Sequence, residues 1–125
     1  MDREDKSSTQ QRQVHPDETL NQLCCGGLQL IQAKNGYRFS LDPVLLANFA
    51  TLKRADRVLD MGCGCGVIAL LLARMVEDVE VVGVEIQAQQ VDRARRSVRL
   101  NALEERVRIE VGDVRTWSQG QDCGF

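Results

Sequence analysis

The order of apolar and polar residues in the second half of the chain predicts alternating strands and helices. Apolar, β-favouring residues at positions 58–59 precede a glycine-rich turn. Residues 67–76 follow that turn and open with seven consecutive apolar positions, which predicts a buried helix. Residues 80–85, EVVGVE, and residues 107–111, VRIEV, have the composition of two further strands.

Residues 87–101, between the last two strands, have the period of an amphipathic helix. Apolar residues recur three or four positions apart along it, at Ala88, Val91, Ala94, Val98 and Ala102. Strands that alternate with helices are typical of α/β domains. We therefore expect an α/β, Rossmann-like fold in three doubly wound layers, with a mainly parallel sheet that is incomplete at its C-terminal end.

The N-terminal part of the chain is organised differently. Residues 1–19 are almost all polar or charged, which predicts a disordered leader. Residues 28–32 read as a strand, Asn35-Gly36 is a strong turn signal, and residues 37–39 read as a second strand. Residues 20–56 should thus form a β-hairpin and a short helix ahead of the main domain, which we place at residues 57–125.

The short helix is predicted over residues 44–50, where Asp42 and Pro43 suit the N-cap and the first helical position.

Composition adds few constraints. The chain has 125 residues, of which 43% are hydrophobic and 27% charged, as in ordinary globular domains. A net charge of −2 gives no general attraction to nucleic acid, so a nucleic-acid partner would need a local basic patch. The longest apolar run falls far short of the about 20 residues that span a bilayer, and the N-terminus carries no apolar signal region. We expect a cytoplasmic protein without membrane contact.

The cysteines and the single histidine do not form an evident metal or nucleophilic site. No two cysteines have the C-x₂-C spacing, and five cysteines cannot all pair within one chain. We expect free thiols and no metal. The cysteines are Cys24, Cys25, Cys63, Cys65 and Cys123. His15 lies in the polar leader, so a Ser–His or Cys–His arrangement is not expected.

The turn after the first predicted strand has glycine at alternate positions, Gly62, Gly64 and Gly66. Glycines allow positive φ and let a ligand approach main-chain N–H groups at a helix N-terminus, which predicts a nucleotide-type ligand. Asp60 stands just before the turn. Its carboxylate would repel a pyrophosphate and attract a ligand that carries an ammonium and a sulfonium.

A second acid, Glu85, ends the next predicted strand, 19 positions after Gly66 (85 − 66). An acid at this place in a nucleoside-binding α/β unit accepts hydrogen bonds from the ribose hydroxyls. Dinucleotide-binding domains use the same acid, and acids also end strands simply because strand ends are solvated. Glu85 therefore does not decide between ligands.

The pattern Asp60-x-Gly62-x-Gly64-x-Gly66 resembles motif I of the class I methyltransferases. Residues 37–50, YRFSLDPVLLANFA, are similar to the segment ahead of motif I in the tRNA adenine-N6 methyltransferase group. The resemblance implies S-adenosylmethionine as cofactor, held at its methionine part by Asp60, and RNA, most often tRNA, as substrate.

The same resemblance implies two further groups of contacts. Tyr37, Phe39 and Asp42 would form a wall over the methyl donor, although capping of a helix alone would also account for Asp42. Asp113 would accept a hydrogen bond from the adenine amino group, and the Val114 N–H would meet a ring nitrogen. A loop aspartate that turns the chain remains the alternative for Asp113.

The resemblance ends before a fourth strand that carries Asn or Asp followed by Pro-Pro and an aromatic residue, which in that group holds the target nitrogen. We therefore assign no catalytic residue, and expect the chain to hold the cofactor half: to bind donor weakly and transfer no methyl group. Two alternatives remain open. Gly64-x-Gly66-x-x-Ala69 also fits an NAD-type dinucleotide fingerprint, and a non-catalytic remnant would bind a partner through an exposed sheet edge.

The predicted amphipathic helix carries arginines on its outward face, Arg93, Arg95, Arg96 and Arg99. From residue 92 to residue 108 there are six arginines and three acids, a local balance of +3 (6 − 3). This face would either contact RNA phosphates or be an ordinary solvated surface, and the sequence leaves both readings open.

Overall fold

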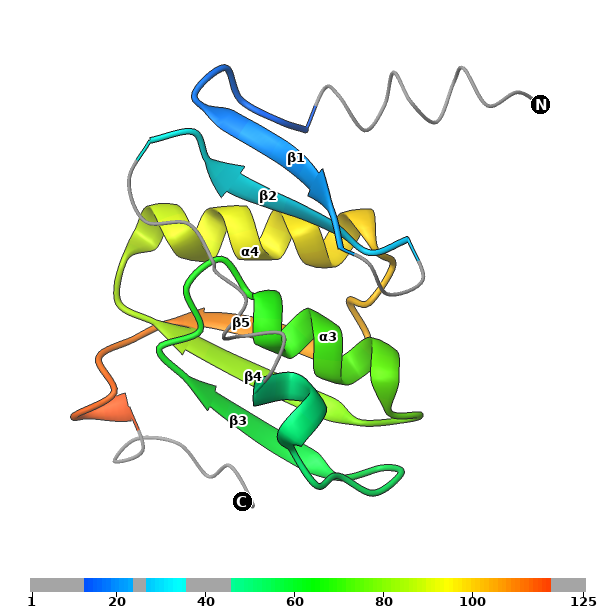
Figure 1. Cartoon of the computed structure of the whole chain (residues 1–125). Coiled ribbons are helices and arrows are strands. Elements are labelled where there is room, and N and C mark those ends of the chain that lie inside the picture. The colour runs from blue at the N-terminus through cyan, green and yellow to red at the C-terminus, as the bar shows by residue number, and fades with distance from the viewer. Residues whose placement is uncertain (1–12, 24–26, 36–45, 118–125) are drawn as a thin grey trace.

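The computed structural model describes residues 13–23, 27–35 and 46–117 (Figure 1). One helical turn at residues 46–49 precedes the main domain. The elements, in chain order, are β1 (Glu18–Gln22), β2 (Gln29–Ala33), β3 (Arg57–Met61), α3 (Val67–Met75), β4 (Glu80–Glu85), α4 (Ala88–Leu100) and β5 (Val107–Val111). None of the helices in the described part of the chain has the length and apolar character needed to cross a membrane.

Strands β3, β4 and β5 form a parallel sheet in that spatial order, with α3 and α4 as the crossover connections. Leu59 pairs in register with Val82, and Gly83 with Ile109. Both helices cover the same face of the sheet, and the three strands end at one edge (Figure 1). The α/β, Rossmann-like prediction is confirmed, and the predicted bounds of these five elements hold to within one or two residues.

The main core lies between this sheet and its two helices. Leu70 and Leu71 of α3 and Val91 of α4 are at most 1% exposed, because the apolar stripe of each helix faces the sheet. Strand β4 is buried at every position after Glu80, as expected of a central parallel strand.

The opposite face of the sheet is covered by Trp117, which packs on Val82 and Val84 of β4 and on Leu59 of β3. Its indole N–H donates to Glu110 Oε2 at 2.8 Å. From the sequence we expect Trp117 to cover the edge of the sheet; the structure places it on the face.

An antiparallel hairpin precedes the main domain, as predicted, and the strand predicted at residues 28–32 is its β2. β1 pairs with β2 in an antiparallel register that sets Leu20 opposite Ile31. The other edge of β2 is occupied by α4, because Ile31 N donates to Ser97 Oγ at 2.9 Å and Gln29 N to Asn101 Oδ1 at 2.9 Å. The described residues thus pair β2 with β1, and the predicted pairing with residues 37–39 lies outside the described residues.

Strand β1 also changes the boundary of the predicted leader. Glu18 and Thr19 belong to this strand, so the predicted leader, residues 1–19, overlaps β1 by two residues. Residues 36–45, which include the segment of the predicted second strand, lie outside the described residues. The hairpin lies on the side of α4 that faces away from the parallel sheet, so sheet, helices and hairpin form successive layers (Figure 1).

Candidate functional site

The three glycines of the turn between β3 and α3 all adopt left-handed backbone. Gly62, Gly64 and Gly66 have φ of 76°, 56° and 89°, a region that residues with a Cβ rarely enter. Gly62 N donates to Val84 O at 2.7 Å, which fixes the turn against β4. Gly66 is the N-cap of α3, and a Cβ there would lie 3.2 Å from the Cβ of Ala94 in α4. The turn therefore requires glycine for its backbone and for helix packing.

Cys63, between the first two glycines, is a packing residue. It is buried against Gly83 of β4, where an added Cβ would lie 2.8 Å from Cys63 Sγ. Burial, with the nearby charges of Asp60 and Glu85, raises the pKa of the Cys63 thiol to about 12. Burial also raises the pKa of Cys65. Both are free, neutral thiols, as predicted; the other three cysteines lie outside the described residues.

Asp60 is the next-to-last residue of β3 and lies opposite Gly83 in the sheet. Its Oδ2 atom is buried and has no hydrogen-bond partner among the described residues. Burial raises the pKa of this carboxyl to about 6. A buried carboxylate oxygen without a partner is costly, and a bound cation would satisfy it. The structure thus presents an unfilled acceptor beside the glycine turn, where the sequence predicts a cationic group.

Glu85 ends β4 and is 9% exposed. Its Oε1 accepts from Gly64 N at 3.1 Å, and its Oε2 accepts from Gln87 N at 2.8 Å. The carboxylate therefore ties the glycine turn to the start of α4, a role that the sequence did not reveal. Each carboxylate oxygen can accept more than one hydrogen bond, so acceptor capacity remains for a ribose hydroxyl.

Asp113 follows β5, and its carboxylate is paired with a near neighbour. Arg115 donates to it from its main-chain N at 2.9 Å and from Nη2 at 2.6 Å. These hydrogen bonds lower the pKa of Asp113. An adenine amino group would therefore share this carboxylate with Arg115. Val114, beside it, is 43% exposed.

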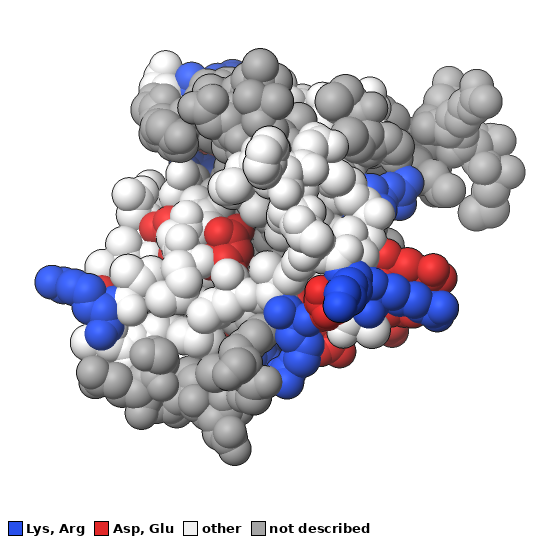
Figure 2. Space-filling view, turned by 60° about the horizontal axis from the view of Figure 1, so that its bottom comes forward, with Lys and Arg blue, Asp and Glu red and all other residues white. Residues whose placement is uncertain are grey.

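Asp60, Glu85 and Asp113 lie at or just beyond the ends of three adjacent parallel strands. Apolar side chains at the same edge are exposed, at Met61, Ile86, Val111 and Val114. Figure 2 shows acidic groups left of centre set among uncharged residues, a basic group at the far left edge, and a separate mixed blue and red cluster at the right. Ile86 is 61% exposed beside Glu85. It was not predicted as a site residue, although its position directly after a strand-end acid could have indicated it. Such a surface suits the flat face of a base.

Tyr37, Phe39 and Asp42 lie outside the described residues, so their place over the methyl donor stays a prediction. Of the helix predicted at residues 44–50, the described part is helical at residues 46–49, and Ala47 is buried in the main core.

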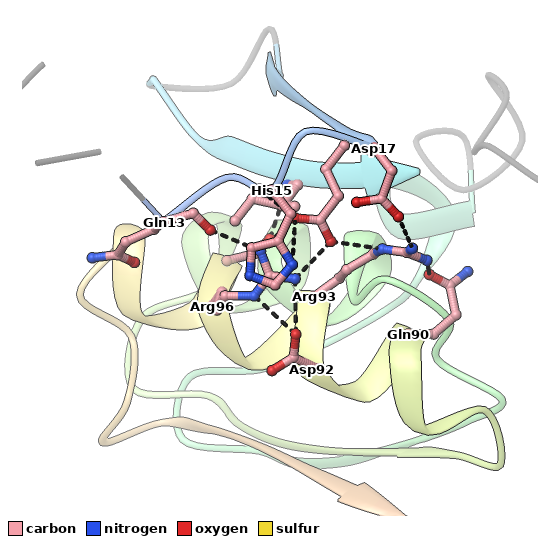
Figure 3. Close-up of polar contacts among 10 residues, drawn as sticks. Gln13, His15, Asp17, Gln90, Asp92, Arg93 and Arg96 are labelled. Atoms are coloured by element: carbon pink, nitrogen blue, oxygen red, sulfur yellow. Dashed lines mark hydrogen bonds and ion pairs between the residues drawn. The ribbon is translucent and has the colours of Figure 1, made fainter. Parts of the chain in front are cut away.

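A second polar cluster joins the hairpin to α4 (Figure 3). Glu18 of β1 accepts from Arg96 Nη2 at 2.6 Å and from Arg93 Nε at 2.8 Å, and Arg96 Nη2 also pairs with Asp92 Oδ2 at 2.8 Å. Burial alone would raise the pKa of Glu18, but hydrogen bonds from Arg96, the His15 N–H and Arg93 outweigh it and lower the pKa to about 2. The placement of Arg93 and Arg96 on an outward, solvated face is wrong, because β1 covers them and Arg96 is only 7% exposed.

His15, Asp17 and Glu18 bring one ligand atom each within 4.8 Å of one another. Both oxygens of Glu18 already accept from guanidinium groups. Two adjacent arginines repel a divalent cation, so this group is an ion-pair cluster and does not suit a metal.

Comparison with known proteins agrees with this geometry. Residues 42–122 match the methyltransferase small domain family. The tRNA1(Val) (adenine(37)-N6)-methyltransferase of Cronobacter sakazakii is 37% identical over 81 residues, which cover 64% of this chain and 33% of the relative. The chain thus spans about a third of the length of the curated relatives it matches.

Two solved structures have the same fold. A putative transferase from Pyrococcus horikoshii superposes with a TM-score of 0.69 at 21% identity, covering 82% of this chain and 39% of that protein. The tRNA (uracil-54, C5)-methyltransferase of Pyrococcus abyssi, in complex with S-adenosyl-L-homocysteine, gives a TM-score of 0.60 at 21% identity over 78% of this chain and 24% of that protein.

The family match covers well over half of the chain, and it includes the glycine turn and all three strand-end carboxylates. The unfilled acceptor of Asp60 is consistent with the cationic cofactor of such enzymes. This chain belongs to the methyltransferase small domain family of S-adenosylmethionine-dependent methyltransferases.

Proposed function

We propose that this chain is the cofactor-binding part of an N-methyltransferase that acts on adenine N6 of tRNA or another RNA. The observation that carries the proposal is the buried Oδ2 of Asp60 beside the left-handed glycine turn, for which the described residues provide no hydrogen-bond partner. The name of the Cronobacter relative supports adenine N6 of tRNA as the target.

S-adenosylmethionine, when bound, supplies a methyl group activated by its sulfonium. Asp60 would accept hydrogen bonds from the ammonium of the methionine part, directly or through water. The glycine turn would leave room for the ligand beside the main chain, and Glu85 would accept from the ribose hydroxyls with its remaining lone pairs. Asp113 and the Val114 N–H would hold the adenine, with the exposed side chain of Ile86 against its face.

An NAD-type domain is the competing candidate. A pyrophosphate beside the glycine turn would meet the negative charge of Asp60, the next-to-last residue of β3. S-adenosylmethionine avoids this repulsion because its groups nearest Asp60 would be positive.

Isothermal titration of the purified chain with S-adenosylhomocysteine and, separately, with NAD distinguishes the two candidates. We expect S-adenosylhomocysteine to bind and NAD to give no measurable heat at the same concentrations. Tighter binding of NAD would reject the proposal.

Methyl transfer requires a group that holds the target nitrogen in line with the donor methyl. The two prolines of this sequence are not adjacent, so the Asn- or Asp-Pro-Pro-aromatic sequence of the resembled group is not in it. We therefore propose that this chain by itself binds donor and does not methylate RNA. Incorporation of labelled methyl groups into a tRNA transcript by the purified chain would contradict this part of the proposal.

A further inference from the structure

The six arginines of residues 92–108 divide into two sets in the structure. Three are used internally. Arg93 and Arg96 hold Glu18, and Arg106 donates to the main-chain carbonyls of Ala73 at 2.7 Å and Val79 at 3.2 Å, at the end of α3. The other three, Arg95, Arg99 and Arg108, line one groove between α4 and β5.

This groove has a volume of about 300 Å³. Its apolar walls, Val98, Val107 and Ile109, are each at most 4% exposed, so these three side chains themselves offer little surface to a partner. Glu104 is the one acid that lines the groove within the described residues. The charged residues of the lining are thus three arginines and one acid, a balance of +2 (3 − 1), which suits an anion.

Two of the three arginines have partners within the fold, and of these only Arg108 is paired with an acid. Arg95 Nε donates to Ile109 O at 2.9 Å, which holds its guanidinium at the outer edge of β5. Arg108 pairs with Glu110 at 2.9 Å, and that acid also accepts from Trp117. Arg99 is exposed and has no ion pair among the described residues, although it lies four positions from Arg95 on the same helix face. Like charges at this spacing repel, and a bound polyanion would relieve the repulsion.

We propose that Arg95, Arg99 and Arg108 bind the phosphate backbone of the RNA substrate; this inference rests on the proposed function. Guanidinium groups bind phosphate oxygens through paired N–H donors. From Arg108 to Asp113 the chain advances five residues, about 16 Å along an extended strand. One nucleotide does not span this separation, whereas an RNA with its target adenine at the strand ends does.

The test measures binding of a fluorescein-labelled RNA hairpin of the anticodon stem-loop type to the full chain at a series of salt concentrations. For a variant with Arg95→Gln, Arg99→Gln and Arg108→Gln, we expect affinity at low salt to fall at least tenfold. The slope of log affinity against log salt should become shallower by about 2, at about 0.7 for each phosphate contact.

A matched variant, Lys53→Gln, Arg54→Gln and Arg57→Gln, removes the same charge near the start of β3 and should keep the wild-type slope. The single variant Arg99→Gln breaks no internal hydrogen bond among the described residues, and it should still reduce the slope by about 0.7. Together these variants separate the groove from general electrostatics and from misfolding.

Titration with S-adenosylhomocysteine distinguishes a failure of the groove assignment from a failure of the proposed function. If wild type and the groove variant bind it equally and only RNA binding falls, the inference holds. If the groove variant and the matched variant give the same RNA binding, or the wild type binds S-adenosylhomocysteine but no RNA at about 50 mM salt, the groove assignment is wrong. If the wild type does not bind S-adenosylhomocysteine, the proposed function itself fails.

Discussion

Glu18 and Arg96 form a buried ion pair between the first described strand and helix α4, 78 positions apart in the chain. The side chains are 2% and 8% exposed, and Arg93 adds a second guanidinium to the same carboxylate. This pair holds the hairpin to the helix whose first turn adjoins the strand-end acid Glu85.

Glu18→Gln should therefore destabilise the fold. The substitution keeps the shape of the side chain but leaves Arg93 and Arg96 with only exposed acids, Asp17 and Asp92, as counter-charges. We expect a cost of about 3 kcal/mol in the free energy of unfolding. Urea denaturation followed by circular dichroism measures it. Glu80→Gln is the control, since its pair with Arg57 is exposed and should cost less than about 1 kcal/mol. Equal effects of both substitutions would show that the buried pair is not stabilising.

Glu18 should also make the free energy of unfolding depend on pH in the acid range. Its pKa is about 2 in the folded chain against an ordinary value of 4.5. A lowered pKa stabilises the fold above the ordinary value, and that contribution is lost as pH falls from about 4.5 to about 2. The difference in unfolding free energy between wild type and Glu18→Gln should shrink across this range. A difference that stays constant down to about pH 2 would contradict this linkage.

The pKa of Asp60 is shifted in the opposite direction. Its pKa is raised from 3.8 to about 6, so its contribution to stability is full below about pH 4 and is lost as pH rises through about 6. Asp60→Asn should make the ligand-free chain more stable at neutral pH, by about 2 kcal/mol, and should weaken binding of S-adenosylhomocysteine at least tenfold.

Thermal unfolding and isothermal titration of the same Asp60→Asn sample check both effects. The control Asp78→Asn removes an exposed acid that pairs with Arg54 and should change neither quantity appreciably. A variant that is destabilised while binding is unchanged would mean that Asp60 serves the fold alone.

Gly66 tests the geometry of the turn. Alanine at this position would combine a φ of 89° with a Cβ 3.2 Å from that of Ala94. We expect Gly66→Ala to cost about 2 kcal/mol or more in the free energy of unfolding. Gly27→Ala is the matched control, because its φ is 76° but an added Cβ meets nothing within 4 Å. If both variants lose the same stability, contact with α4 contributes nothing.

Much of the parallel domain was predictable because its signals are local. β4 is a continuous β-favouring run, the bounds of α3 follow from seven apolar positions, and the glycines mark their own turn. The pairing of β2 was not predictable in this way. The sequence of β1, ETLNQ, has no apolar alternation. The arginines that bind its first residue, Glu18, lie more than 70 positions away in the chain.

The candidate site shows the same division. The positions of Asp60 and Glu85 near strand ends could be predicted because the apolar runs that form these strands are visible in the sequence. The hydrogen bonds of Glu85 to Gly64 N and Gln87 N, and the pairing of Asp113 with Arg115, depend on main-chain direction and side-chain rotamers, which residue patterns do not specify.

We propose that Asp60 gives this glycine turn its affinity for a positively charged nucleoside ligand. The most direct test is the affinity of the purified chain for S-adenosylhomocysteine, measured by isothermal titration from about pH 5 to about pH 8. Since the pKa of Asp60 is about 6, affinity should fall towards tenfold per pH unit below that value in the wild type, and should be nearly independent of pH in Asp60→Asn. A wild-type affinity that does not change over this range, or that changes equally in Asp60→Asn, would show that the Asp60 carboxylate does not bind the ligand.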